Sequence, residues 1–99
     1  MELIDLLIEL KQENEKYFLE PVKYAGIIKN RAIELFGIGV RTFLFGSVVK
    51  GNFTYLSDID VLVMAPGLKP GLHAKESVAL KKDFEFGSPF QIILCNEEQ

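Results

Sequence analysis

The chain has 99 residues, the length of one domain, and we take residues 1–99 as a single domain. Its 48% hydrophobic and 25% charged residues are typical of a folded globular protein and argue against disorder. The net charge of −3 argues against strong general binding to nucleic acid. The single cysteine excludes an internal disulfide, and no segment is typical of a signal peptide or a membrane span, so we expect a cytoplasmic protein.

The N-terminal part, residues 1–36, predicts two helices. In the first, over residues 2–17, apolar side chains recur at helical spacing, at Leu3, Ile4, Leu7 and Leu10. Its segment KQENEK has no apolar face and is expected to be solvated and frayed. Pro21 suits the first turn of the second helix. The buried side of that helix is predicted at Ala25, Ile28, Ala32, Leu35 and Phe36, before Gly37 and Gly39 end it.

The motif core, residues 40–95, predicts three strands and one further helix. The expected strands are Val40–Phe45, Asp58–Met64 and Phe90–Cys95, with a helix at Leu72–Phe86 between the last two. This order predicts an α/β (α+β) fold, a small mixed sheet packed against helices, two of them N-terminal. Aromatic residues are expected mostly in the core, at Tyr17, Phe18, Tyr24, Phe36, Phe43 and Phe45.

Two aspartates, Asp58 and Asp60, begin the second strand, which is otherwise apolar. Residues two apart on a strand face the same way, with α-carbons roughly 6.5–7 Å apart, so both carboxylates can approach one or two divalent cations. Magnesium suits such oxygen ligands. For an isolated D-x-D pattern, a pair of solvated acids is the more frequent interpretation.

A Gly-Ser turn after the first strand supports the metal interpretation. Gly46 has no side chain, so a phosphate can approach the backbone N–H groups, and Ser47 adds a hydroxyl and is expected to cap a short helix. Lys50, in the connecting segment, is either a contact for the phosphates or a solvated surface lysine.

The motif "GS", ten residues and then "DID" resembles the signature G-S-x10-D-x-D of the minimal nucleotidyltransferases, in the polymerase-β-type nucleotidyltransferase superfamily. The resemblance covers roughly residues 17–95. It implies the superfamily fold and Mg²⁺-dependent transfer of a nucleoside monophosphate, typically AMP from ATP, to a hydroxyl acceptor. By position, Gly46, Ser47 and Ser57 would contact the phosphates, and Asp58 and Asp60 would be catalytic metal ligands. It also implies an antitoxin-like role beside an all-helical HEPN ribonuclease.

The family usually has a third carboxylate on a neighbouring strand, and the position expected to carry it is Gln91 in this sequence. A glutamine amide can coordinate a metal through its oxygen, but it has no charge and cannot act as a general base. Glu85 is a conceivable substitute six residues earlier. Three functions therefore stay open: an active nucleotidyltransferase, an impaired module that binds a nucleotide or a partner in a toxin–antitoxin pair, and a structural interaction domain. An apolar first helix also leaves self-association open.

Overall fold

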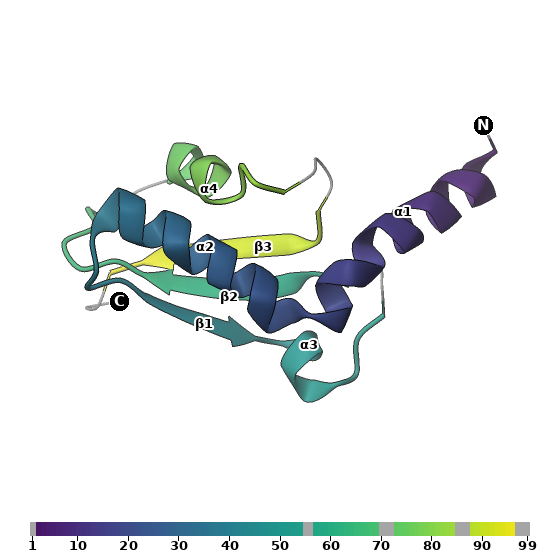
Figure 1. Ribbon diagram of the computed structural model, residues 1–99, viewed down its shortest axis with the longest axis horizontal. Helices are drawn as coiled ribbons and strands as arrows, with labels where there is room; N and C mark the ends of the chain where they lie inside the picture. The colour runs from purple at the N-terminus through teal and green to yellow at the C-terminus, as the bar shows by residue number, and fades with distance from the viewer. Residues whose placement is uncertain (1, 55–56, 70–72, 85–87, 97–99) are drawn as a thin grey trace.

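The computed structural model describes residues 2–54, 57–69, 73–84 and 88–96. Within them the chain forms four helices and three strands (Figure 1): α1 (Leu3–Leu19), α2 (Pro21–Phe36), β1 (Arg41–Phe45), α3 (Ser47–Lys50), β2 (Ile59–Met64), α4 (Ala74–Leu80) and β3 (Phe90–Cys95). The mixed α/β architecture expected from the sequence is confirmed. None of the helices in these ranges is long and apolar enough to cross a bilayer.

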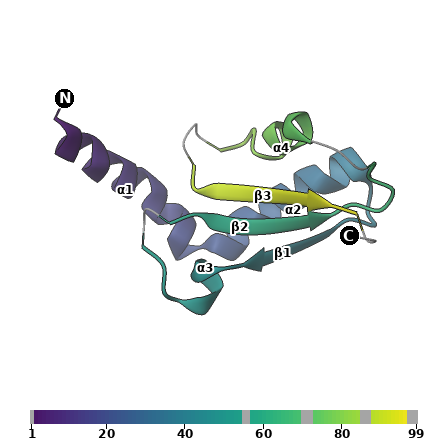
Figure 2. The ribbon, with the colours of Figure 1, turned by 180° about the vertical axis from the view of Figure 1, so that it is seen from behind.

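The sheet has the order β1-β2-β3, with β1 antiparallel and β3 parallel to β2. Its central strand β2 alternates strictly, with Ile59, Val61 and Val63 fully buried and the residues between them half-buried. Because side chains alternate along a strand, one face of the sheet is the core face and the other is more open. Helices α2 and α4 cover the core face, and no helix of the described ranges covers the other (Figures 1 and 2).

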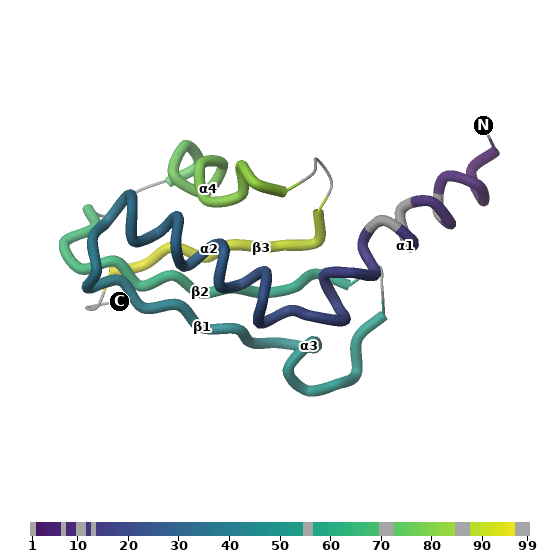
Figure 3. Tube along the Cα trace, in the orientation of Figure 1, coloured from purple at the N-terminus to yellow at the C-terminus, as the bar shows by residue number. Residues whose placement is uncertain are grey.

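An aromatic cluster connects the C-terminal end of α1 to the domain. Tyr17 is buried and contacts three other rings edge-on, with centroids 4.8 Å away at Tyr24, 5.7 Å at Phe84 and 5.4 Å at Phe90. Phe18 is also buried and stacks on Phe53 at 5.1 Å. The N-terminal half of α1 instead extends away from the sheet (Figure 3).

Four expectations about the elements are wrong. Leu35, expected on the buried side of α2, is 48% exposed. Helix α1 continues through KQENEK to Leu19 instead of fraying, because Tyr17 and Phe18 anchor its last turns. Helix α4 covers Ala74–Leu80 and turns follow it up to Phe84, so it is shorter than the expected Leu72–Phe86, of which residues 72, 85 and 86 lie outside the described ranges. Phe43 and Phe45 are not core residues but lie partly exposed, since strand alternation turns them to the open face.

An ion pair connects the turn after α4 to helix α2. Arg31 donates from Nε and Nη2 to the two carboxylate oxygens of Asp83, at 2.6 and 2.8 Å, and from Nη1 to Glu34 at 2.9 Å. These bonds from Arg31 hold the pKa of Asp83 below its usual value of 3.8. The planar guanidinium, which binds both oxygens at once, thus connects segments 52 residues apart in the chain.

Asp83→Asn is expected to lower the melting temperature at neutral pH and to remove part of its acid dependence. A carboxyl whose pKa is lowered by folding stabilises the folded state above its unfolded pKa. That stabilisation is lost as pH falls from 3.8 through the lower folded value. Melting curves between pH 7 and pH 2.5 should therefore show the two proteins converging below about pH 4.

The matched control is Glu34→Gln, which removes the other carboxylate on Arg31 but leaves the link to the α4 turn. It should change the melting temperature less, because exposed pairs within one helix contribute little. A constant difference between Asp83→Asn and wild type across this pH range would contradict the assignment.

Candidate active site

The residues expected in the site meet at one end of the sheet. Strand β1 ends there, while β2 and the parallel β3 begin there. In the register, Asp60 lies opposite Phe45 on one side and opposite Gln91 on the other. Because paired residues of neighbouring strands face the same side, these three side chains form one row on the open face.

Gly46, directly after β1, lies against the Asp60 carboxylate. Its backbone has φ +85° and ψ −154°, a region that is essentially restricted to glycine. A Cβ built on Gly46 would overlap Oδ2 of Asp60 and would lie 3.4 Å from its Cγ. The glycine thus allows the main chain at the β1–α3 turn to approach the carboxylate.

The short helix behind the turn begins one residue earlier than expected. Gly46 is its N-cap and Ser47 its first residue, so the expectation that Ser47 caps this helix is wrong. The amides of Val49 and Lys50 both donate to the carbonyl of Gly46, at 3.2 Å, so those of Ser47 and Val48 precede the first helical bond. Lys50 ends the helix and is exposed.

In the segment before β2, the Ser57 side chain is hydrogen-bonded within a turn, whereas the Asp58 side chain is exposed. Asp58 is exposed and directly precedes the strand, with the fully buried Ile59 between it and Asp60. Ser57 closes a turn with Thr54: its Oγ accepts a bond from the Thr54 amide at 3.0 Å and lies 3.3 Å from the Thr54 hydroxyl. The Ser57 hydroxyl therefore has local partners, whereas the Asp58 carboxylate projects into solvent.

Gln91 is exposed, and it occupies the position beside Asp60 where a third carboxylate would stand. Within the described ranges, no three side chains among His, Cys, Asp and Glu gather as metal ligands. Glu85, the conceivable substitute, lies outside the described residues. Beside the Gly46 turn lie the Asp60 carboxylate and the Gln91 amide, with the exposed Asp58 two residues before Asp60. Oxygen donors of these kinds suit a hard cation that also takes oxygens from phosphate and water.

Gly46→Ala is expected to lower the free energy of unfolding by about 1–3 kcal/mol, the usual cost of a backbone conformation disfavoured for the residue. The new Cβ would also displace the Asp60 carboxylate. Urea denaturation measures this change. Gly51→Ala is the control: Gly51 also has a positive φ, +80°, but nothing lies within 4 Å of its Cβ position. A loss at Gly46 no larger than that at Gly51 would contradict the contact.

Sequence reasoning missed the open-face environment of the acids. Phe45 lies in the row of Asp60, and Phe43 pairs with Leu62 in the next row, opposite Ile93. All three of Phe43, Phe45 and Ile93 are partly exposed, so an apolar surface continues from the acids along the sheet. The alternation of side chains along each strand, which turns Asp60 away from the core, would have predicted this exposed apolar surface.

The fold and this row of residues describe an α/β domain with paired acids at a glycine turn. A family model described as a nucleotidyltransferase domain matches residues 26–98, and the chain therefore belongs to this family. Comparisons with curated proteins and with solved structures gave no significant match. The matched segment begins within α2, so α1 lies outside it.

Proposed function

We propose that this nucleotidyltransferase domain is a Mg²⁺-dependent enzyme that transfers a nucleoside monophosphate, AMP from ATP, to a hydroxyl group of a protein. The observation that carries the proposal is the contact between the Gly46 backbone and the Asp60 carboxylate. It brings the glycine turn that we propose for phosphate binding next to the carboxylate that we propose as a cation ligand, in the family whose model the chain matches. On the open face of the sheet, neither the Gly46 backbone nor the Asp60 carboxylate contributes evidently to the packing of the core.

Asp58 and Asp60 would hold Mg²⁺, with the amide oxygen of Gln91 as a neutral third donor. The bound metal would neutralise phosphate charge and polarise the phosphorus that is attacked. The amides of Ser47 and Val48 and the Ser47 hydroxyl would orient the phosphates. Lys50, exposed on the same short helix, would add a positive charge toward the outer phosphates. The Ser57 hydroxyl would contribute only if it left its bonds to Thr54.

In the proposed reaction, the acceptor oxygen forms a bond to the α-phosphorus of ATP. The bond from that phosphorus to the oxygen bridging to the β-phosphate breaks, and pyrophosphate leaves. The proton of the acceptor hydroxyl passes to water or to a base of the acceptor protein, because Gln91 has no basic group. Transfer is consequently slower than with a third carboxylate.

The proposed acceptor is a protein partner in the cytoplasm, of the HEPN type that the family resemblance suggests. Two observations support a protein rather than nucleic acid. The net charge is −3, and the surface that continues from the acids is apolar, with Phe43, Phe45 and Ile93 partly exposed. Aromatic side chains of this kind are enriched at protein interfaces, whereas nucleic acid needs clustered basic residues.

A second function is favoured by one observation, the pairing of Asp60 with Gln91. Without a third acid, the domain would bind Mg²⁺-ATP or its partner and would complete no transfer. It would then act in a toxin–antitoxin pair through binding alone. In its nucleotide-binding form this second function requires the same site as the first, and the two then differ only in turnover.

The test is calorimetric titration of ATP with Mg²⁺ into wild type and into Asp58→Asn/Asp60→Asn, followed by an assay of pyrophosphate release with the candidate acceptor. We expect binding by wild type that disappears with EDTA and in the double variant. Asp5→Asn/Glu9→Gln, which neutralises two exposed acids on α1, is the control and should bind like wild type. No binding by wild type would overturn the transfer function and the nucleotide-binding form of the second function, leaving binding to a partner alone, and binding without release would support the second.

A further inference from the structure

A pocket outside the candidate active site opens between helix α2 and strand β1. Its volume is about 200 Å³, and it is lined by Val22, Ala25, Gly26, Lys29, Thr42 and Leu44. The α2 members follow the spacing i, i+3, i+4, i+7, which is the row that a helix presents to a second helix packed alongside. Strand β1 is an edge of the described sheet, so the pocket lies at the molecule's border.

Two features of this pocket reduce the stability of a single chain. Gly26 stands in the middle of α2, where only proline is less favourable than glycine, and nothing lies within 4 Å of its Cβ position. No contact within the described chain thus requires a glycine there. The hydroxyl oxygen of Thr42 is buried and has no hydrogen-bond partner. A missing side chain beside an unsatisfied hydroxyl indicates that something outside the described chain fills the space.

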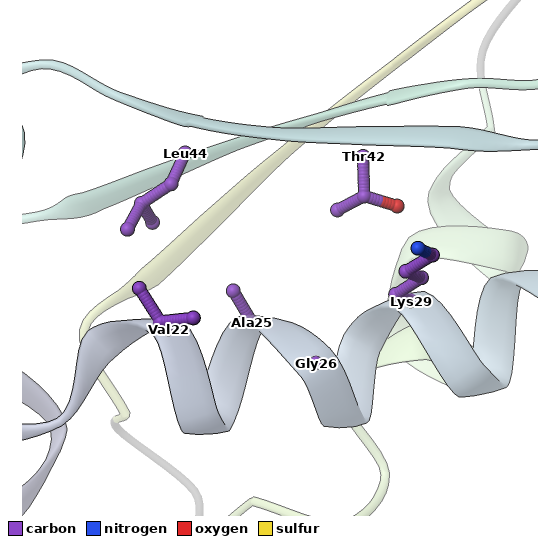
Figure 4. Close-up of a pocket in the computed structure, with 6 residues that line it drawn as sticks. All are labelled: Val22, Ala25, Gly26, Lys29, Thr42 and Leu44. Atoms are coloured by element: carbon purple, nitrogen blue, oxygen red, sulfur yellow. The ribbon is translucent and has the colours of Figure 1, made fainter.

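The pocket has an apolar end and a polar end (Figure 4). Val22, Ala25 and Leu44 point toward one another at the first end, while the Thr42 hydroxyl and the Lys29 ammonium lie at the second. In the described ranges Lys29 forms no ion pair with an acid. The complementary ligand is therefore an apolar side chain with a carboxylate beside it.

The N-terminal half of α1 carries this combination. Leu3 and Ile4 are each 69% exposed, Ile8 is 49% exposed, and this part of the helix extends away from the domain. On a helix, Ile4 and Ile8 form one row and Asp5 and Glu9 the row beside it. Residues 2–10 contain three acids and no basic residue. An apolar row bordered by acids complements a pocket with Lys29 and a free hydroxyl at one end.

We propose that α1 of one copy of this chain packs into the α2–β1 pocket of a second copy, and that the exchange is reciprocal. Within one chain α1 cannot reach the pocket, because it leads into α2 through Glu20 alone and extends away from it. Two copies that exchange α1 form the same contact twice and close as a two-fold dimer. Ile4 and Ile8 enter beside Gly26, and a carboxylate of Asp5 or Glu9 accepts bonds from Thr42 and Lys29.

Sedimentation velocity across about 1–100 μM tests the proposal. We expect a wild-type dimer in this range. Gly26→Leu fills the pocket, and Ile4→Lys/Ile8→Lys places charge on the exposed row of α1. Each change should raise the dimer Kd about tenfold or more. The control Val78→Lys changes an exposed apolar residue of α4 and should dimerise like wild type. Circular dichroism should show native helix in every variant.

Mixing the two variants distinguishes packing of α1 into the α2–β1 pocket from pairing of α1 with α1. The Gly26→Leu chain keeps its α1, and the Ile4→Lys/Ile8→Lys chain keeps its pocket, so their mixture should form heterodimers through one of the two contacts. Pairing of α1 with α1 gives no such rescue. A monomeric wild type, a Gly26→Leu chain that dimerises like wild type, or a mixture without heterodimer would each overturn the proposal.

Discussion

Replacing Gln91 with aspartate is expected to raise the rate of nucleotidyl transfer by about 10²–10⁴-fold, the usual contribution of a positioned general base. Gln91 pairs with Asp60 across β2 and β3, and both side chains belong to the open face. A carboxylate there would join the proposed metal ligands, Asp58 and Asp60, and would take the proton of the acceptor hydroxyl. Because Gln91 is exposed, the shorter acidic side chain should cause little loss of stability.

The measurement is pyrophosphate release under single-turnover conditions, with Mg²⁺-ATP and the acceptor protein in excess over their dissociation constants. Val78→Asp is the control, since it adds a carboxylate at an exposed position of α4, which lies on the other face of the sheet from Asp60 (Figure 1). It should leave the rate unchanged. Equal rates for wild type and Gln91→Asp would show that the missing acid does not limit transfer, and an equal gain from Val78→Asp would show that the position of the carboxylate does not matter.

Tyr17→Ala is expected to lower the free energy of unfolding by about 3–5 kcal/mol, the range for removing a large buried aromatic side chain. Tyr17 is 2% exposed and contacts three other aromatic rings, two of which come from the C-terminal half of the domain. Its removal leaves a cavity where α1, α2 and β3 meet. Domains are typically stable by about 5–15 kcal/mol, so the variant should be close to unfolding at 37 °C.

Urea denaturation followed by circular dichroism measures this loss. Tyr17→Phe keeps the ring and the edge-on contacts, so its midpoint should lie close to that of wild type. Leu3→Ala, which truncates an exposed residue of the same helix, should also have little effect on a monomer. A change of less than about 1 kcal/mol for Tyr17→Ala would show that the cluster does not hold α1 to the domain.

Most of the fold could be predicted from local pattern. The apolar runs from Val40, Ile59 and Phe90 mark the strands within one residue, because a buried strand needs consecutive or alternating apolar side chains. Pro21 marks the first residue of α2 for a local reason as well. The close approach of Gly46 to Asp60 was not predicted, because it depends on the pairing of β1 with β2.

The misses have non-local causes. The end of α4 depends on Phe84 joining the aromatic cluster and on Asp83 reaching Arg31, 52 residues earlier, which no sequence window contains. The local hydrogen bond that Ser57 Oγ accepts from the Thr54 amide depends on the conformation of the loop before β2, which the sequence does not reveal. The pocket at Gly26 arises because β1 forms an edge of the described sheet, a property of strand order that spacing does not reveal.

The strand order also affects when the protein acquires binding competence during synthesis. Strands β1 and β2, with Gly46, Asp58 and Asp60, leave the ribosome before β3. A two-stranded hairpin is marginally stable in water at best, so the paired acids and the glycine turn are not held together until β3 pairs with β2. Capture of a nucleotide at the proposed site should consequently begin only once residues up to Cys95 have left the exit tunnel.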